Sequence, residues 1–453
     1  MKEFIKTVGK LTATVLMCAV IAFGFMWWAM SLDTEPMKEH SKAYTKENVG
    51  VLHKAYLNTS RIIDTETDGL ILEMAVYNDG ETSFDRAIRV PKAMYLDITD
   101  SARQSYISDE FNQLNSYLSG TGYKATEAAV ENKDSDTYTR YDYGRYWHGF
   151  TGVTKVLLRW FDVYTVYTVF NLLLLGGLIW FMIEANGVDK RLTMLPVGFI
   201  MVIAPLSIMN CFQFMEVSIP TLYLGAVLCK LNKRLTDKKT TLIFYCVAGC
   251  VINFFDLLTY PVAACMLLVF VGAVLNGWRP LEIIKHSLSW FCGYFGLWAS
   301  KLILLVLYDN NLLKQTIDHL LLRINNEAYA GEKQYVYSWL TIEPNDYIEI
   351  TPIAGLVLNS AYLLNAVELI TFALILAFVL FGVWKNRGQL SKNTLKDRFK
   401  QSWGLLLIPL LSIMWYLAMT GHSVVHAWFT WRSMAVAVLV IIFYIKTLCT
   451  ERN

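Results

Sequence analysis

The sequence predicts an all-α, polytopic membrane protein with about ten membrane-spanning helices. Of its 453 residues, 55% are hydrophobic and only 17% are charged, and its mean hydropathy is +0.37. This composition is typical of an integral membrane protein. Long apolar runs recur along the chain, and the loops between them alternate in charge. The formal net charge of +2 offers no basic surface for a nucleic-acid partner.

The first apolar run extends from Leu11 to Met30 and follows Lys2, Lys6 and Lys10. A basic start before an apolar run is also typical of a secretory signal. This run, however, is long enough to cross a hydrocarbon core of ~30 Å, and no small-residue cleavage site follows it. We therefore expect a retained first helix.

Loop charges predict the topology independently of hydropathy, because cytoplasmic loops carry an excess of lysine and arginine. The loop from Lys385 to Lys400 contains six basic residues against the single acid Asp397. Placing it inside makes both termini cytoplasmic in a multi-pass protein of the cell membrane. About nine further apolar runs follow the first, at approximately 163–183, 193–209, 216–231, 240–256, 258–276, 286–308, 356–384, 403–419 and 430–448.

The opposite, extracytoplasmic side then receives two long segments. Residues 32–160 contain more acids than bases, opposite in bias to the inner loops, and form a large first loop; residues 309–355 form a second. Helical composition recurs in the first loop, at 35–58, 67–78 and 102–119. No repeat or linker divides the chain, so we expect one membrane domain, 1–453, with a long helical first loop.

Three acids stand near the start of this loop. Asp64, Glu66 and Asp68 directly precede the apolar run Leu70–Leu72, as in a helix whose first turn carries negative charge. A solvated helix cap is the simple interpretation, and a catalytic acid is the functional one. Glu66 stands between the two aspartates and is the expected bystander.

An arginine and a histidine lie among aromatic residues before the second run. Arg145 and His148 belong to the segment from Asp142 to Phe150. An arginine beside aromatic rings can hold a phosphate while the rings stack on a sugar. An ordinary aromatic belt with an arginine reaching the interface is the alternative.

Three charged residues fall at or within apolar runs. Glu216 begins a very apolar run, Asp256 joins two runs with almost no loop, and Lys301 lies partway along the seventh. Such charges are costly in a membrane unless they are solvated, paired or functional. Capping of the next helix by Asp256 and pairing of Lys301 with Asp256 are the structural alternatives.

The last outer turn contains His422 and His426, which at spacing i, i+4 share a helix face, followed by Arg432. Such a pair can bind a metal, but the motif has no neighbouring acid, so the zinc interpretation is weak. Hydrogen bonding to a phosphate and simple interhelical structure are both open. Arg323, in the second long loop, could meet the same anion as Lys301 or could be solvated.

Together these features resemble the GT-C class of integral membrane glycosyltransferases. The resemblance rests on the first helix, the long acidic first loop, the many spans with short loops and the outward Arg and His. It implies a sugar donor carried on polyprenyl phosphate and a first-loop acid that acts as general base or metal ligand. That role falls on Asp64 or Asp68, with a slight preference for Asp68. The chain lacks the adjacent paired acids that usually follow the first helix, so the choice between the two stays open.

The expected function is transfer of a sugar from a polyprenyl-phosphate-linked donor to an extracytoplasmic glycan, lipid or protein acceptor of the cell envelope. The sequence identifies no definite cofactor, and Mg²⁺ or Mn²⁺ could bridge Asp64, Asp68 and the phosphate. A transporter or flippase of lipid-linked sugars and a noncatalytic envelope scaffold are the alternatives. The expected substrate-binding residues are Arg145, His148, Glu216, Asp256, Lys301, Arg323, His422, His426 and Arg432.

Overall fold

The computed structural model is predominantly helical. It describes residues 2–48, 53–55, 62–78, 80–95, 138–232, 238–309, 317, 320–321, 323–324, 333–335, 347–349, 353–364, 366–385 and 391–450. Within these residues, six helices are long and apolar enough to cross a membrane: Lys2–Met30, Val163–Val188, Phe212–Leu231, Pro280–Tyr308, Lys392–Ala418 and Ala427–Cys449. The expected helical, multi-pass architecture is confirmed at this level. Five shorter apolar helices, of 10–17 residues, accompany them, so the total of about ten spans stays a prediction.

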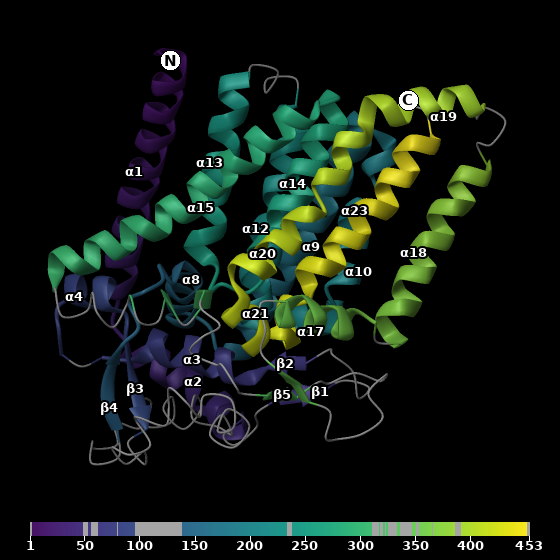
Figure 1. Cartoon of the computed structure of the whole chain (residues 1–453). Helices are drawn as coiled ribbons and strands as arrows, with labels where there is room; N and C mark the ends of the chain where they lie inside the picture. Colours follow the sequence, from purple (N-terminus) through teal and green to yellow (C-terminus); the bar gives the residue numbers. More distant parts are fainter. Residues whose placement is uncertain are drawn as a thin grey trace.

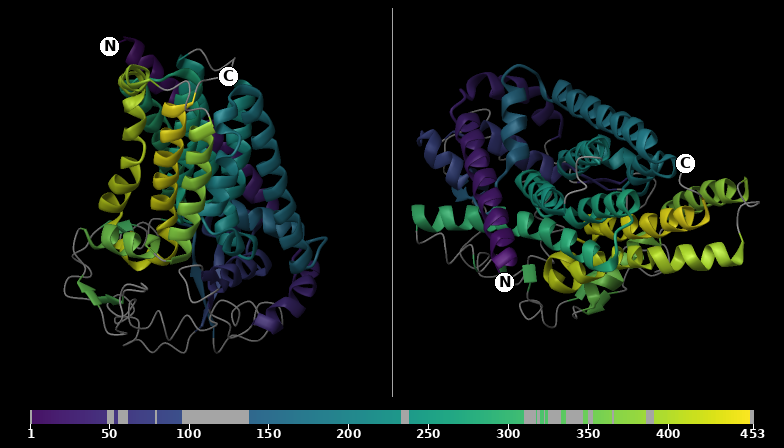
Figure 2. Two further views of the ribbon diagram at one scale, coloured as in Figure 1. Left: turned by 90° about the vertical axis from the view of Figure 1, so that its right-hand side faces the viewer. Right: turned by 90° about the horizontal axis from the view of Figure 1, so that it is seen from above.

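The long helices form one bundle (Figures 1 and 2). Its main helices are α1 (Lys2–Met30), α9 (Val163–Val188), α12 (Phe212–Leu231), α13 (Lys238–Phe255), α14 (Pro261–Asn276), α15 (Pro280–Tyr308), α18 (Ala366–Lys385), α20 (Leu410–Ala418) and α23 (Arg432–Cys449). Shorter pieces complete it: α8 (Gly149–Leu158), η1 (Lys190–Leu192), α10 (Leu195–Val202), α11 (Pro205–Met209), α17 (Ala354–Leu363), α19 (Lys392–Ser402), η4 (Trp403–Leu407), α21 (Thr420–Val425) and α22 (Ala427–Thr430).

Helix α14 lies at the centre of the bundle. It packs against α12, α15, α20 and α23, and every residue from Pro261 to Leu275 is buried. A helix that is apolar on all sides is stable only where neighbours cover it completely. Helices α1 and α18 lie at opposite edges (Figures 1 and 2) and expose large apolar side chains such as Val20 and Leu374. These edges have the surface that lipid contact requires.

Helices α13 and α15 approach each other at two glycines. A Cβ atom at Gly249 would lie 2.0 Å from the Trp290 carbonyl oxygen, and one at Gly293 would lie 1.9 Å from the Cys246 carbonyl oxygen. Both distances are far below van der Waals contact. Small residues at such a crossing let two backbones pack directly, as is common between membrane helices.

The two ends of the bundle carry different parts of the chain. Both termini and α19 lie at one end, whereas the first-loop elements, α17 and α21 lie at the other (Figure 1). The first-loop elements are α2 (Glu35–Asn48), β1 (His53–Ala55), β2 (Ile62–Asp64), α3 (Thr65–Val76), α4 (Ser83–Arg89), β3 (Pro91–Tyr95) and β4 (Tyr138–Asp142). The segments that loop charge assigned to one side therefore share one end of the bundle.

The expectation of a long helical first loop holds only in part, because the described loop contains strands as well as helices. The predicted helix 35–58 ends at Asn48, and His53 instead pairs with Asp64 in a two-stranded antiparallel sheet. A second sheet pairs β3 with β4, and a third joins β5 (Lys333–Tyr335) to β6 (Tyr347–Glu349) in the second long loop. Strand pairing between distant segments depends on tertiary contacts that local composition does not reveal. The predicted helix 67–78 corresponds to α3, and 102–119 lies outside the described residues.

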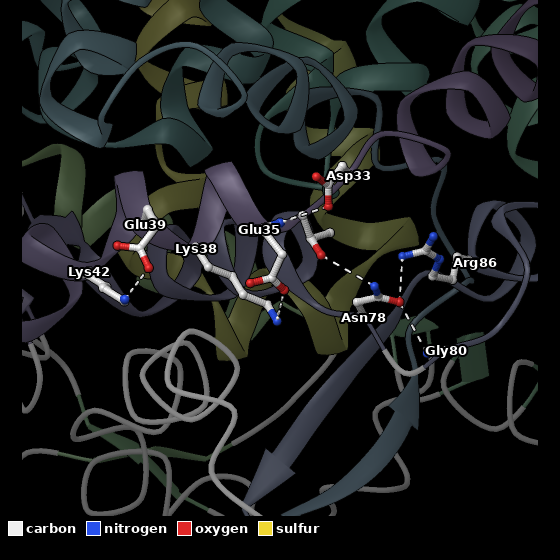
Figure 3. Close-up of polar contacts among 9 residues, drawn as sticks. Asp33, Glu35, Lys38, Glu39, Lys42, Asn78, Gly80 and Arg86 are labelled. Carbon is white, nitrogen blue, oxygen red and sulfur yellow. Dashed lines mark hydrogen bonds and ion pairs between the residues drawn. The ribbon is translucent and has the colours of Figure 1, made fainter.

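Polar contacts join the helix ends of the first loop (Figure 3). The Asn78 amide donates to Thr34 Oγ1 at 3.5 Å, before α2, and its oxygen accepts from Arg86 of α4 at 3.1 Å. Along α2, Lys38 pairs with Glu35 at 3.0 Å. Asn78, two residues after α3, thus ties α3 to α4 and to the start of α2.

Candidate functional site

The turn between α13 and α14, residues 256–260, is where several predicted site residues converge. Leu258 adopts φ of 70° and is buried. A left-handed backbone at a bulky residue costs on the order of 1–3 kcal/mol and persists only where its surroundings impose it. The turn is therefore held in place by its neighbours rather than by its own preference.

Three predicted site residues impose this conformation. Glu216 Oε1 accepts from the Leu257 backbone N–H at 2.9 Å. Asp256 Oδ1 accepts from the Thr259 backbone N–H at 2.7 Å. His422 Nε2 lies 2.5 Å from the Leu258 carbonyl oxygen. Side chains from three elements thus meet at one strained turn.

Asp256 closes the turn that precedes α14. Besides the Thr259 N–H, its carboxylate accepts from the Thr259 hydroxyl at 2.6 Å and from the Tyr294 hydroxyl at 2.6 Å. Burial raises the pKa of Asp256 to about 6, although these hydrogen bonds favour the ionised form. The suggested capping of the following helix by Asp256 is wrong, because α14 begins at Pro261 after the N-cap residue Tyr260, and Asp256 binds Thr259 of the turn before it. Lys301 contacts carbonyl groups instead, so the suggested pairing with Asp256 is wrong.

Glu216 lies in the first part of α12 and is fully buried. Its Oε1 holds the Leu257 N–H, whereas its Oε2 accepts no hydrogen bond from any residue in the described ranges. Its charged neighbours are acids, Asp256 first and then Asp68. A buried carboxyl group among acids with one oxygen unengaged is energetically costly.

Arg323 joins the histidine pair. Its Nη1 lies 2.7 Å from His426 Nε2 and 3.4 Å from His422 Nδ1. A guanidinium only donates, so both of these ring nitrogens accept, and His422 Nε2–H donates to Leu258. Burial, followed by the charge of Arg323, lowers the pKa of both histidines well below the usual value. The histidines are neutral here, and Arg323 carries the positive charge.

Arg145 brings a second guanidinium to this group. Its Cζ lies 4.1 Å from the Tyr143 ring centroid and 5.5 Å from that of Tyr146. Burial raises the pKa of Tyr146, and the charges of Arg323 and Arg145 oppose that rise. Arg145 also contributes to lowering the pKa of His426. We call Arg145, Arg323, His422 and His426 the arginine–histidine cluster.

His148 helps to hold the segment that carries Arg145. It has φ of 56° directly before α8, and its Nε2 lies 2.8 Å from the Tyr143 carbonyl oxygen. Its ring is 5.1 Å from the Tyr143 ring, centroid to centroid. Tyr146 in turn stacks on Trp298 of α15, with 6.0 Å between ring centroids and an interplanar angle of 13°. His148 thus helps to fix the aromatic segment on which Arg145 lies.

Asp68 anchors the first loop to α12. Its Oδ1 accepts from the backbone N–H groups of Phe212 at 2.8 Å and Gln213 at 3.4 Å. Its Oδ2 accepts from the Tyr167 hydroxyl. A carboxylate at a helix N-terminus satisfies donors that have no intrahelical acceptor and lies at the positive end of the dipole. The expected solvated cap of its own helix is therefore wrong for Asp68, which is buried and caps α12 instead.

Two buried lysines of the bundle bind the C-terminal ends of first-loop helices, whereas Asp68 of the first loop binds the N-terminal end of a bundle helix. Lys301 of α15 donates to the carbonyl oxygens of Ala87 at 2.9 Å and Ile88 at 2.8 Å, in the last turn of α4. Lys155 of α8 donates to the Ala75 carbonyl oxygen, in the last turn of α3. Ammonium groups at helix C-termini bind carbonyl oxygens that lack intrahelical donors. Composition did not single out Lys155, which lies in a short apolar helix.

Arg432 lies near the turn, and its guanidinium donates to carbonyl groups of the helical bundle. Its Nε donates to the Ile203 carbonyl oxygen at 3.0 Å and its Nη1 to that of Phe429 at 3.3 Å. Its Cζ lies 3.8 Å from the Phe214 ring centroid. These contacts fix the start of α23 against α10 and α12.

Asp64 ends β2, and its side chain lies outside the described residues. Among the residues that are described, no group of three or more His, Cys, Asp or Glu could hold a metal ion. Sequence reasoning missed Tyr294, Thr259 and Leu258. Only the i, i+3 spacing of Asp256 and Thr259 in a very short connection could have suggested a turn closed by a side chain.

The chain is thus a helical protein with six candidate membrane-spanning helices in its described part, and its predicted site residues fall into a converging group and a set of structural anchors. No family model matches the chain, and no curated protein and no solved structure matches it either.

Proposed function

We propose that this protein is a membrane glycosyltransferase that moves a sugar from a polyprenyl-phosphate-linked donor to an extracytoplasmic glycan, lipid or protein of the cell envelope. One observation supports this most: Arg323 Nη1 lies 2.7 Å from His426 Nε2, and Arg145, from a distant segment, has its Cζ 5.5 Å from the Tyr146 ring centroid. Arg323 contacts imidazoles rather than carboxylates among the residues described. A guanidinium held by neutral acceptors keeps its charge for an anion such as phosphate.

The chemistry requires such a group. The acceptor oxygen bonds to the anomeric carbon as the bond from that carbon to the phosphate oxygen breaks, and the hydroxyl proton passes to a base. The polyprenyl phosphate leaves with the negative charge, which the two arginines stabilise. Phosphate is already a good leaving group, so no protein acid is required.

Asp64 is the first-loop acid that we assign as base. Asp68 was the preferred residue on sequence alone, but its carboxylate serves the N-terminus of α12 and the Tyr167 hydroxyl. Mg²⁺ or Mn²⁺ held by Asp64 and the phosphate is part of the same proposal, since such ions need few protein ligands. The proposed orientation has both termini in the cytoplasm and the arginine–histidine cluster outside.

The proposal is tested in membrane vesicles that contain the natural acceptors, using a labelled polyprenyl-phosphate hexose. Arg323→Gln should lower transfer by about 10- to 100-fold, the worth of one charged hydrogen bond. Arg159→Gln is the matched control, because Arg159 lies at the end of α8 and contacts only the Trp160 ring, at 5.8 Å, among described aromatic groups. Wild-type transfer and wild-type lipid affinity in Arg323→Gln would contradict the proposal. Movement of the labelled lipid across sealed vesicles without transfer would favour the transporter.

A further inference from the structure

Buried oxygen atoms without donors gather around the strained turn. Glu216 Oε2, Gln213 Oε1 and Asn253 Oδ1 are buried and accept no hydrogen bond within the described part of the chain. Gln213 and Glu216 are three residues apart on α12 and so share one helix face. Asn253 lies beside Tyr294, which donates to Asp256 of the turn. The three oxygens therefore belong to one region.

The N–H groups of Leu257 and Thr259 and the hydroxyl groups of Thr259 and Tyr260 are already engaged. The Leu257 N–H serves Glu216 Oε1, and the Thr259 N–H and hydroxyl serve Asp256. The Tyr260 hydroxyl lies 2.7 Å from Ser218 Oγ and donates to the Phe214 carbonyl oxygen at 2.5 Å. Buried acceptors that remain unsatisfied cost on the order of 1–3 kcal/mol each. A ligand with several hydroxyl donors would satisfy them.

The turn connects these acceptors to the arginine–histidine cluster. Glu216 holds the N–H of Leu257, and His422 holds the carbonyl oxygen of the next residue, Leu258. Arg323 lies on the other side of His422. Arg323 and Glu216 are therefore linked through His422 and the single dipeptide Leu257–Leu258.

We propose that Glu216, with Gln213 beside it, recognises the hydroxyl groups of the donor sugar while the arginine–histidine cluster binds the phosphate. This inference rests on the proposed function and specifies its substrate: a neutral sugar with free hydroxyl groups next to the phosphate. A site built to accept hydrogen bonds from hydroxyl groups discriminates strongly against a ligand that lacks them. Glu216 is a binding residue in this proposal, and the base is Asp64.

The substitution Glu216→Gln tests the proposal without removing the structural contact. The Leu257 N–H requires an acceptor, so the amide oxygen of the new side chain faces it, and the amide N–H₂ takes the place of Oε2. At the position of Oε2, the substitution therefore replaces a hydrogen-bond acceptor with a donor. Removing a buried carboxyl group should leave the thermal midpoint unchanged or raised.

The measurement is the affinity of the purified protein for polyprenyl phosphate with and without an attached hexose. The wild type should bind the sugar-bearing lipid more tightly, and Glu216→Gln should reduce this preference by 10-fold or more while the affinity for bare polyprenyl phosphate is unchanged. Arg323→Gln should lower the affinity for both lipids by the same factor. Glu184→Gln is the control, because that glutamate accepts from Trp180 of its own helix α9.

The possible outcomes separate the two proposals. Full sugar preference in Glu216→Gln overturns the role of Glu216 and leaves the glycosyltransferase proposal standing. Absence of binding of either lipid by the wild type overturns the proposed function itself. If Glu216→Gln lowers the thermal midpoint, Gln213→Leu decides, because it changes the same face of α12 and leaves the Leu257 contact intact. Retained sugar preference in Gln213→Leu would then overturn the inference.

Discussion

Replacing Asp68 separates a structural carboxylate from a catalytic one. Asp68→Leu removes the acceptor of the Phe212 and Gln213 N–H groups and of the Tyr167 hydroxyl. Loss of an N-terminal cap costs about 1 kcal/mol, loss of the charge at a buried helix dipole up to about 2 kcal/mol, and loss of a buried hydroxyl acceptor about 1–3 kcal/mol. Relief of carboxylate desolvation offsets part of this sum. The expected net destabilisation is about 3 kcal/mol.

Asp68→Asn should cost much less. Its amide oxygen still accepts from Phe212, and the Tyr167 hydroxyl can reverse to accept from the amide N–H. Only the charge at the helix end is lost, about 1 kcal/mol. Both variants can be compared with the wild type by denaturant unfolding in detergent, followed by circular dichroism, together with transfer per folded molecule. If Asp68→Asn is as stable as the wild type but loses transfer, and Asp64→Asn retains it, our assignment of the two aspartates is wrong.

Two further predictions follow from buried groups. Because the pKa of His422 and of His426 is lowered in the folded protein, the unfolded chain binds more protons below pH ~6.5. The stability of the wild type should be at its full value above that pH and should fall as the pH decreases. In a double variant with Gln at both positions, the thermal midpoint should depend less on pH. An unchanged pH dependence of the midpoint would show that these histidines are not its cause. Gly293→Ala should destabilise the protein by about 1–3 kcal/mol by forcing a Cβ against Cys246. Gly24→Ala, with nothing within 4 Å, should be neutral or stabilising in the same thermal assay.

The class of protein and the shared end of the bundle could be predicted because both depend on composition and loop charge. The individual charged residues could not be assigned in the same way. An ammonium within an apolar run suggests a functional group, yet the partners of Lys301 are the carbonyl oxygens of Ala87 and Ile88, more than two hundred residues earlier. The last turn of α4 has to be placed in three dimensions before that pairing becomes visible.

The same limit applies to the converging group. The i, i+4 spacing of His422 and His426 predicted a shared face, and their rings do lie 4.8 Å apart. No local pattern indicated that Arg323 meets them, because it comes from a long loop. Likewise, nothing in the sequence of Leu258 predicts a left-handed backbone, which its neighbours impose. Tertiary contacts overrode local preference at both places.

The buried charges of Asp68, Lys155 and Lys301 have a consequence for biogenesis. The first loop leaves the ribosome early, but the α12 and α15 groups that it contacts are made later, Lys301 more than two hundred residues after α4. At about 5–20 residues per second, the last of these contacts becomes available roughly 10–40 s after the loop itself. During that interval the last turn of α4 lacks its ammonium partner. Insertion of α15 therefore completes the fold of a segment that was synthesised long before it.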